Sequence, residues 1–186
     1  MVNVLDMDSR GFSQEKVWEE AFRVSSLFLR IEPTYCDTHT NGSLHLDCNR
    51  CQQRFKELAY RIFEELCEAA DTHDLDHKKE EIADAVLFTN LLFKLVNLPF
   101  YIKWSTDLGT MGDPLINLGL MTNCLKLRPW RRQYSEVDIG QLKKSAERLV
   151  ESLANLVIFF FKDEEDFLDF VDRKVQVNEF RFNSKY

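Results

Sequence analysis

The sequence predicts an all-α protein: a helical bundle built on two helix-hairpin repeats, of which the second is degenerate. Glycine and proline interrupt helices, and the chain has only Gly 6 and Pro 4 among its 186 residues. Long stretches also place apolar residues at the spacing of a helix that buries one face. The length suits one folding unit with a real core, so we expect residues 1–186 to form a single domain.

Charge and hydropathy limit the classes of partner. The net charge of -7 would repel a nucleic-acid backbone. The sequence shows no run of about twenty apolar residues and no basic-then-apolar leader. An odd total of 5 cysteines is more typical of an intracellular chain than of a disulfide scaffold. We therefore expect a cytoplasmic protein with neither a nucleic-acid nor a membrane partner.

The first helix is expected over residues 14–31. Its apolar residues recur at helical spacing and are Val17, Trp18, Ala21, Phe22, Val24, Leu27 and Phe28. Ser13 is a favourable N-cap residue, and Pro33 cannot continue a helix. The pattern is that of an amphipathic helix with one face against a core.

Residues 33–50 are the least helical part of the chain and, with Cys51, hold a group of cysteines and histidines. Cys36 and His39 form a Cys-x2-His pair, and Cys48 and Cys51 form a Cys-x2-Cys pair. Spacings of this kind can hold a structural zinc ion. The alternatives are a polar connection whose thiols stay reduced, or a flap over the acidic residues described below.

Residues 52–98 are expected to form a hairpin of two antiparallel helices. Amphipathic stretches over 51–70 and 78–97 predict the helices, and Pro99 stops the second. The polar stretch 71–77 between them is a suitable turn. A reversal of the chain there places the two helices side by side.

This hairpin carries two acidic pairs, Glu65 with Glu68 and Glu81 with Asp84. Within each pair the spacing of three residues puts both carboxylates on one helical face. When the chain folds back at the turn, Glu65 lies opposite Asp84 and Glu68 lies opposite Glu81. Four carboxylates then converge on one patch.

Partial burial would make this patch unfavourable without a cation. Glu65 continues the apolar stripe of Leu58 and Ile62, and Asp84 continues that of Phe88. Carboxylates that are crowded and desolvated repel one another, and a divalent cation removes both costs. Oxygen-only ligands favour Mg²⁺, with Mn²⁺ as a substitute. The alternative is a solvated acidic face without a metal.

The sequence of residues 115–161 resembles that of the hairpin, but without its acidic pairs. Asn123 and Lys126 stand in the places of the first acidic pair, and Ser152 and Asn155 stand in those of the second. We interpret this region as a degenerate repeat that became scaffold and substrate wall. The two hairpins together supply the four core helices of a bundle.

Residues 162–186 predict a C-terminal helix and tail that bind phosphate. Lys174, Asn178 and Arg181 share one helical face, and Tyr186 follows them. An ammonium group, an amide and a guanidinium group on one face suit a phosphate chain, which arginine can hold through two bonds. The alternative is that these basic residues only complement the helix dipole.

Two motifs resemble one enzyme superfamily. EELCE, twelve residues and then EIAD fit the pattern EExxE–spacer–ExxD, and the ending from Lys174 to Tyr186 fits KxxxNxFRxxxxY. In this order they resemble the all-α nucleoside triphosphate pyrophosphohydrolases, the superfamily of MazG and the dimeric dUTPases. The ending is similar to that of the dimeric dUTPase and phage dCTPase branch. Ser184 and Lys185 depart from the glycine-containing turn that is usual in that branch.

The resemblance implies Mg²⁺-dependent hydrolysis of a nucleoside triphosphate to the monophosphate and pyrophosphate. It implies that Glu65, Glu68, Glu81 and Asp84 hold the metal, with Glu65 or Glu68 as the catalytic base. The expected substrate class is that of a dUTPase or dCTPase. The alternative is a MazG-like dGTP or broad dNTP pyrophosphohydrolase.

The resemblance also implies phosphate contacts from Lys174, Asn178, Arg181 and Tyr186, and a homodimer in which both protomers build the pocket. An alternative of another class is a non-enzymatic helical interaction protein whose cysteine and histidine loop binds zinc.

Overall fold

The computed structural model describes residues 14–29, 43–102, 113–125 and 137–185. These residues are all-helical apart from turns and connections and contain no strand, which confirms the predicted all-α class. The helices are α1 (Gln14–Leu29), α2 (Asn49–Asp71), α3 (Leu75–Leu95), α4 (Pro114–Asn123), α5 (Ile139–Phe160) and α6 (Glu164–Lys185).

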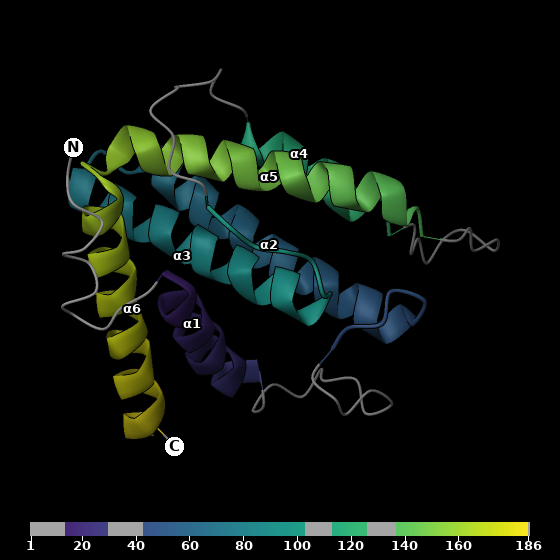
Figure 1. The fold of residues 1–186 in the computed structure, drawn as a ribbon, viewed down its shortest axis with the longest axis horizontal. Coiled ribbons are helices and arrows are strands. Elements are labelled where there is room, and N and C mark those ends of the chain that lie inside the picture. Colours follow the sequence, from purple (N-terminus) through teal and green to yellow (C-terminus); the bar gives the residue numbers. More distant parts are fainter. Residues whose placement is uncertain (1–13, 30–42, 103–112, 126–136, 186) are drawn as a thin grey trace.

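The helices surround a central pair (Figure 1). α2 and α3 lie side by side and run in opposite directions, and α4 and α5 pack against each other and cover one side of that pair. On the other side, α1 and α6 pack against each other and against α3. Because α3 is contacted by α1, α2, α5 and α6, it is the most enclosed helix of the described protein.

The sequence of α3 suits this central position. Its apolar residues point in nearly every direction around the helix, as expected for a helix with neighbours on several sides. Those that are buried are Ile82, Ala83, Ala85, Val86, Leu87, Leu91, Leu92, Phe93 and Leu95. A carboxylate on this helix is therefore held close to the core, and that is the setting of Glu81 and Asp84.

Helix α1 confirms the first predicted element. Val17, Trp18 and Ala21 are buried against the rest of the protein. The amide of Asn90 on α3 donates to the Trp18 carbonyl oxygen at 3.1 Å, which joins the two helices inside the core. The expected N-cap Ser13 lies outside the described residues.

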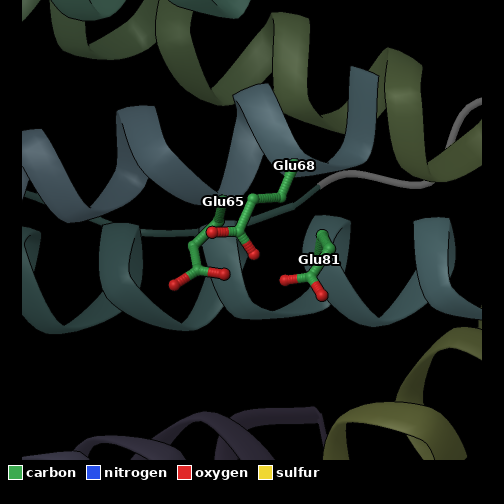
Figure 2. Close-up of side chains that lie close together, drawn as sticks. All are labelled: Glu65, Glu68 and Glu81. Carbon is green, nitrogen blue, oxygen red and sulfur yellow. The ribbon is translucent and has the colours of Figure 1, made fainter. Parts of the chain in front are cut away.

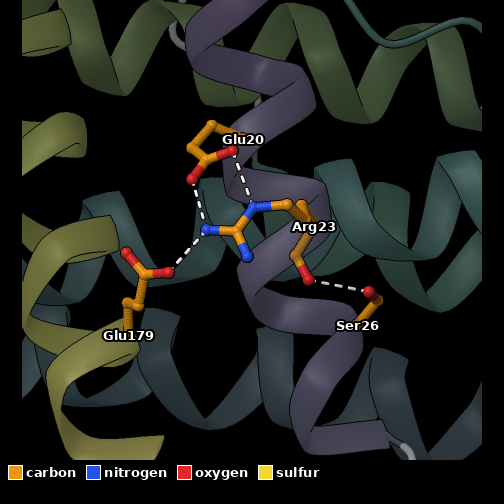
Figure 3. Close-up of polar contacts among 4 residues, drawn as sticks. All are labelled: Glu20, Arg23, Ser26 and Glu179. Atoms are coloured by element: carbon orange, nitrogen blue, oxygen red, sulfur yellow. Dashed lines mark hydrogen bonds and ion pairs between the residues drawn. The ribbon is translucent and has the colours of Figure 1, made fainter. Parts of the chain in front are cut away.

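Arg23 connects α1 to α6 (Figure 3). Its Nε donates to Glu20 Oε2 at 2.8 Å on the same helix, and its Nη2 donates to Glu179 Oε1 at 2.7 Å on α6. The hydrogen bonds that Arg23 donates to Glu20 and then to Glu179 raise its pKa above the ordinary value. Because all three side chains are 40–47% exposed, the link contributes little to the free energy of unfolding.

The connection between α2 and α3 is shorter than the predicted turn at 71–77. α2 continues to Asp71 and α3 already begins at Leu75. The reason is an N-cap: Asp74 accepts hydrogen bonds from the backbone N–H of Asp76 at 2.9 Å and of His77 at 3.1 Å. The predicted antiparallel hairpin is present, and the bounds expected for its turn are wrong.

We expect Asp74→Ala to lower the free energy of unfolding by about 1 kcal/mol, because two N–H groups at the start of α3 lose their acceptor. Urea unfolding followed by circular dichroism measures this change. Asp71→Ala is a matched control, because its carboxylate stands at the C-terminus of α2, where a negative charge is unfavourable. Equal destabilisation by both variants would contradict the capping role.

The region 115–161 also contains two packed helices, α4 and α5. Asp113 caps α4 by accepting from the N–H of Leu115 at 2.9 Å. Asp138 caps α5 by accepting from the N–H of Gln141 at 2.9 Å. Local sequence thus defines the start of both helices. Within the described residues, none of the helices is both long enough and apolar enough to span a membrane.

Candidate metal centre

Three carboxylates from the central helix pair meet at one place (Figure 2). Glu65 and Glu68 project from α2, and Glu81 projects from α3 toward them. One carboxylate oxygen from each residue lies within 4.8 Å of the others. The spacing of three residues on α2 and the reversal at Asp74 together produce this convergence. We call these three residues the acidic cluster.

The acidic cluster lies at the edge of the core. Glu81 is only 7% exposed, Glu65 is partly buried and Glu68 is exposed. Leu58 and Ile62, which precede Glu65 on the same stripe of α2, are buried as the sequence predicts. The cluster therefore has one solvent-facing member and one nearly enclosed member, which leaves an approach from solution.

Glu65 shows the electrostatic cost of this arrangement. Burial raises the pKa of Glu65 to about 8, with further contributions from a hydrogen bond to Glu81 and from the charges of Asp84, Glu81 and Glu68. A carboxyl group with this pKa holds a proton at neutral pH. Without a cation, the cluster therefore reduces its own repulsion by keeping one proton.

Asp84, the fourth predicted carboxylate, is paired differently. Its Oδ2 lies 2.8 Å from Nζ of Lys174 on α6, and the side chains are 22% and 15% exposed. Burial raises the pKa of Asp84, and the hydrogen bond and charge of Lys174 only partly oppose that effect. Asp84 lies one helical turn beyond Glu81, so it stands beside the acidic cluster. Its carboxylate is already paired with the ammonium group of Lys174.

His77 is a neighbour of the cluster that the sequence prediction missed. Its Nε2 lies 2.7 Å from Oε1 of Glu81, four residues later on α3. The prediction placed His77 in a turn, which hid this contact. The available signal was Asp74, whose capping side chain starts the helix early enough to place His77 and Glu81 on one face.

The structure places one residue of the predicted phosphate-binding face beside the acidic cluster. Lys174 reaches Asp84, as described, and Asn178 and Arg181 follow it along α6. Asn178 is partly buried and Arg181 is exposed. Tyr186 lies outside the described residues. Lys174 and Asp84 are therefore spatial neighbours although they are distant in sequence.

Hydrogen-bonding residues of α4 and α5 stand at the positions that the repeat interpretation aligns with the acidic pairs. Ser152 is buried, donates to the Leu149 carbonyl oxygen at 2.9 Å and accepts from Asn117 Nδ2 at 3.3 Å. Asn123 and Asn155 lie on α4 and α5, and Lys126 lies outside the described residues. The interpretation of this region as a degenerate repeat stays a prediction.

The predicted zinc ligands are only partly described. Cys36 and His39 lie outside the described residues. Cys48 immediately precedes α2 and is partly buried, and Cys51 is buried in the first turn of that helix. Of the described cysteine, histidine, aspartate and glutamate residues, only the acidic cluster forms a group of three or more with metal-binding spacing.

A comparison with protein-family models, one with curated proteins and one with solved structures each found no match to the chain.

Proposed function

We propose that the chain is a Mg²⁺-dependent nucleoside triphosphate pyrophosphohydrolase of the MazG and dimeric dUTPase kind. The reaction would release a nucleoside monophosphate and pyrophosphate. The observation that carries the proposal is the meeting of Glu65, Glu68 and Glu81 beside a pair in which Lys174 contacts Asp84. A metal site and a phosphate-binding cation would then be adjacent, which is the arrangement that a triphosphate requires.

The donor set fits the proposed metal. All the candidate ligands are carboxylate oxygens, which Mg²⁺ and Mn²⁺ accept and which zinc and copper sites rarely use alone. The raised pKa of Glu65 also fits, because a group that keeps a proton for lack of a cation exchanges that proton when a cation binds. Glu65, Glu68 and Glu81 would hold the metal, with Asp84 as the fourth ligand.

Each residue of the site has a role that follows from its position. When bound, Mg²⁺ supplies positive charge to the phosphate oxygens and acidifies a water molecule. Glu81 is buried and contacted by His77, so its carboxylate has a defined orientation. Glu65 or Glu68 would take the proton of the attacking water on a carboxylate oxygen that does not bind the metal. Lys174 would bind a phosphate oxygen of the substrate.

The rest of the chain completes the proposed site. Asn178, Arg181 and Tyr186 would add hydrogen bonds to the phosphate chain. The helices α4 and α5 would form the degenerate repeat, which would support α2 and α3 and line one side of the substrate site. By the same resemblance, two copies of the chain would form a homodimer. The preferred substrates would be dUTP or dCTP.

The test is pyrophosphate release from dATP, dGTP, dCTP, dTTP and dUTP, each with Mg²⁺, with Mn²⁺ and with a chelator. We expect metal-dependent turnover of dUTP or dCTP, with monophosphate and pyrophosphate as products. Preferential turnover of dGTP, or of all five, would favour the MazG-like alternative. If no nucleoside triphosphate is hydrolysed with either metal, the enzyme proposal fails and the non-enzymatic interaction protein is favoured.

A further inference from the structure

The contact between Lys174 and Asp84 occupies a carboxylate that the proposed metal would use. Nζ of Lys174 lies 2.8 Å from Oδ2 of Asp84, and both side chains are largely shielded from water. A lysine ammonium group is a cation that offers only donors, so it competes with a metal ion for the negative charge of Asp84. The positive charge of Lys174 also repels a divalent cation at the neighbouring acidic cluster.

The same ammonium group is a candidate partner for the substrate. Lysine is a compact charge on a flexible chain, so it can change partner by side-chain rotation without movement of its helix. A second ion pair between α3 and α6 does not involve Lys174. Lys79 on α3 lies 3.4 Å from Asp166 on α6.

We infer that Lys174 is an internal counter-ion that exchanges between Asp84 in the metal-free protein and a phosphate group in the loaded protein. This inference rests on the metal site proposed above. Metal and triphosphate binding are then coupled: the metal releases Lys174 from Asp84, and a phosphate chain that binds Lys174 makes Asp84 available to the metal. By linkage, each ligand strengthens binding of the other by the same factor.

Titration calorimetry with Mn²⁺ alone tests the first half of the exchange. Lys174→Met removes the charge, keeps the length of the side chain and leaves Asp84 unpaired. We expect it to bind Mn²⁺ at least about tenfold more tightly than the wild-type protein in the absence of nucleotide. Lys79→Met is the matched control, because it also removes a lysine–aspartate contact between α3 and α6. We expect it to leave the Mn²⁺ affinity unchanged.

Binding of inorganic tripolyphosphate in the presence of Mg²⁺ tests the second half. We expect Lys174→Met to bind tripolyphosphate at least about tenfold more weakly, because one phosphate contact is lost. Lys174→Arg keeps a cation and should retain most of the tripolyphosphate affinity. The two effects have opposite signs, which general unfolding or distortion of the variant would not produce.

Lysine-selective acetylation followed by mass spectrometry tests the exchange in the wild-type protein. We expect Mn²⁺ to increase the labelling rate of Lys174 and to leave that of Lys79 unchanged. This measurement does not depend on the folding of any variant. An unchanged labelling rate of Lys174 would overturn the inference.

The outcomes separate this inference from the proposed function. If the protein hydrolyses a triphosphate but Lys174→Met binds Mn²⁺ no more tightly than wild type, the inference is overturned and the enzyme proposal stands. If no triphosphate is hydrolysed but Lys174→Met still strengthens Mn²⁺ binding, the competition for Asp84 is supported and the hydrolase proposal fails. If neither protein binds Mn²⁺ and no triphosphate is hydrolysed, both the inference and the proposed function are overturned.

Discussion

Replacing Glu81 by glutamine is expected to lower Mg²⁺-dependent pyrophosphate release by about 100- to 1,000-fold or more, with the helical fold preserved. Glutamine has nearly the same shape as glutamate but carries no charge, and Glu81 is the most buried member of the acidic cluster. The substitution would remove a negatively charged ligand from the buried side of the proposed metal site, where bulk water cannot take its place. Initial rates with the best substrate of the dNTP screen measure the effect.

The matched control for this variant is Glu80→Gln. Glu80 is the adjacent residue on α3 and is exposed, outside the acidic cluster. We expect it to keep the rate within about twofold of wild type, because an exposed charge away from the reacting groups contributes little. Circular dichroism should show the same helix content in both variants. An active Glu81→Gln enzyme would refute the proposed metal site.

The second large effect is a dependence of stability on pH that is centred on Glu65. The folded protein keeps a proton on this carboxyl group up to a pKa of about 8, whereas its ordinary value is 4.5. Between these two values the unfolded chain has lost the proton and the folded protein has not. The free energy of unfolding of the metal-free protein should therefore be highest near pH 4.5 and fall as the pH rises toward 8.

The size of this effect can be bounded. The change from 4.5 to about 8 corresponds to at most about 5 kcal/mol, and solvent screening of a partly buried side chain reduces it to roughly 1–3 kcal/mol. Asp84 contributes with the same sign, because burial also raises its pKa. Denaturant unfolding at a series of pH values, with a chelator present, measures the total.

Two comparisons identify the source of the pH effect. Glu65→Gln should be more stable than wild type at pH 8 and should lose most of the decline, whereas Glu64→Gln, at an exposed neighbouring position, should keep the wild-type profile. Mg²⁺ should restore stability increasingly as the pH rises, because it binds the deprotonated carboxylates. A wild-type profile that is flat from pH 4.5 to 8 would contradict the raised pKa.

The hairpin of residues 52–98 and the position of its acidic residues could be predicted from the sequence, because helical periodicity is a local property. The spacing of Glu65 and Glu68 places both carboxylates on one face whatever lies around them. A short polar connection then brings that face to the next helix, so the convergence on Glu81 follows from adjacent segments. The structure shows this convergence, and whether a metal occupies it stays a prediction.

The misplaced start of α3 had a local cause as well. A polar stretch such as 71–77 fits a turn by composition, but composition does not show which polar residue is the cap. Asp74 accepts two backbone hydrogen bonds, so the helix begins at Leu75 and places His77 one turn before Glu81. A cap is recognisable in the sequence only when its acceptor and the following helix are considered together.

The sequence by itself determined the helical class, the amphipathic faces and the first acidic hairpin, because these depend on residues within a few turns of one another. Only the tertiary structure decided that Lys174 lies against Asp84 and that α3 is enclosed by four other helices. Periodicity shows which face of α6 is buried. It does not show which helix covers that face, or at which position along α6 the two helices meet. That choice depends on the fit of the whole core, in which α1 and α6 pack against α3 so that Lys174 reaches Asp84.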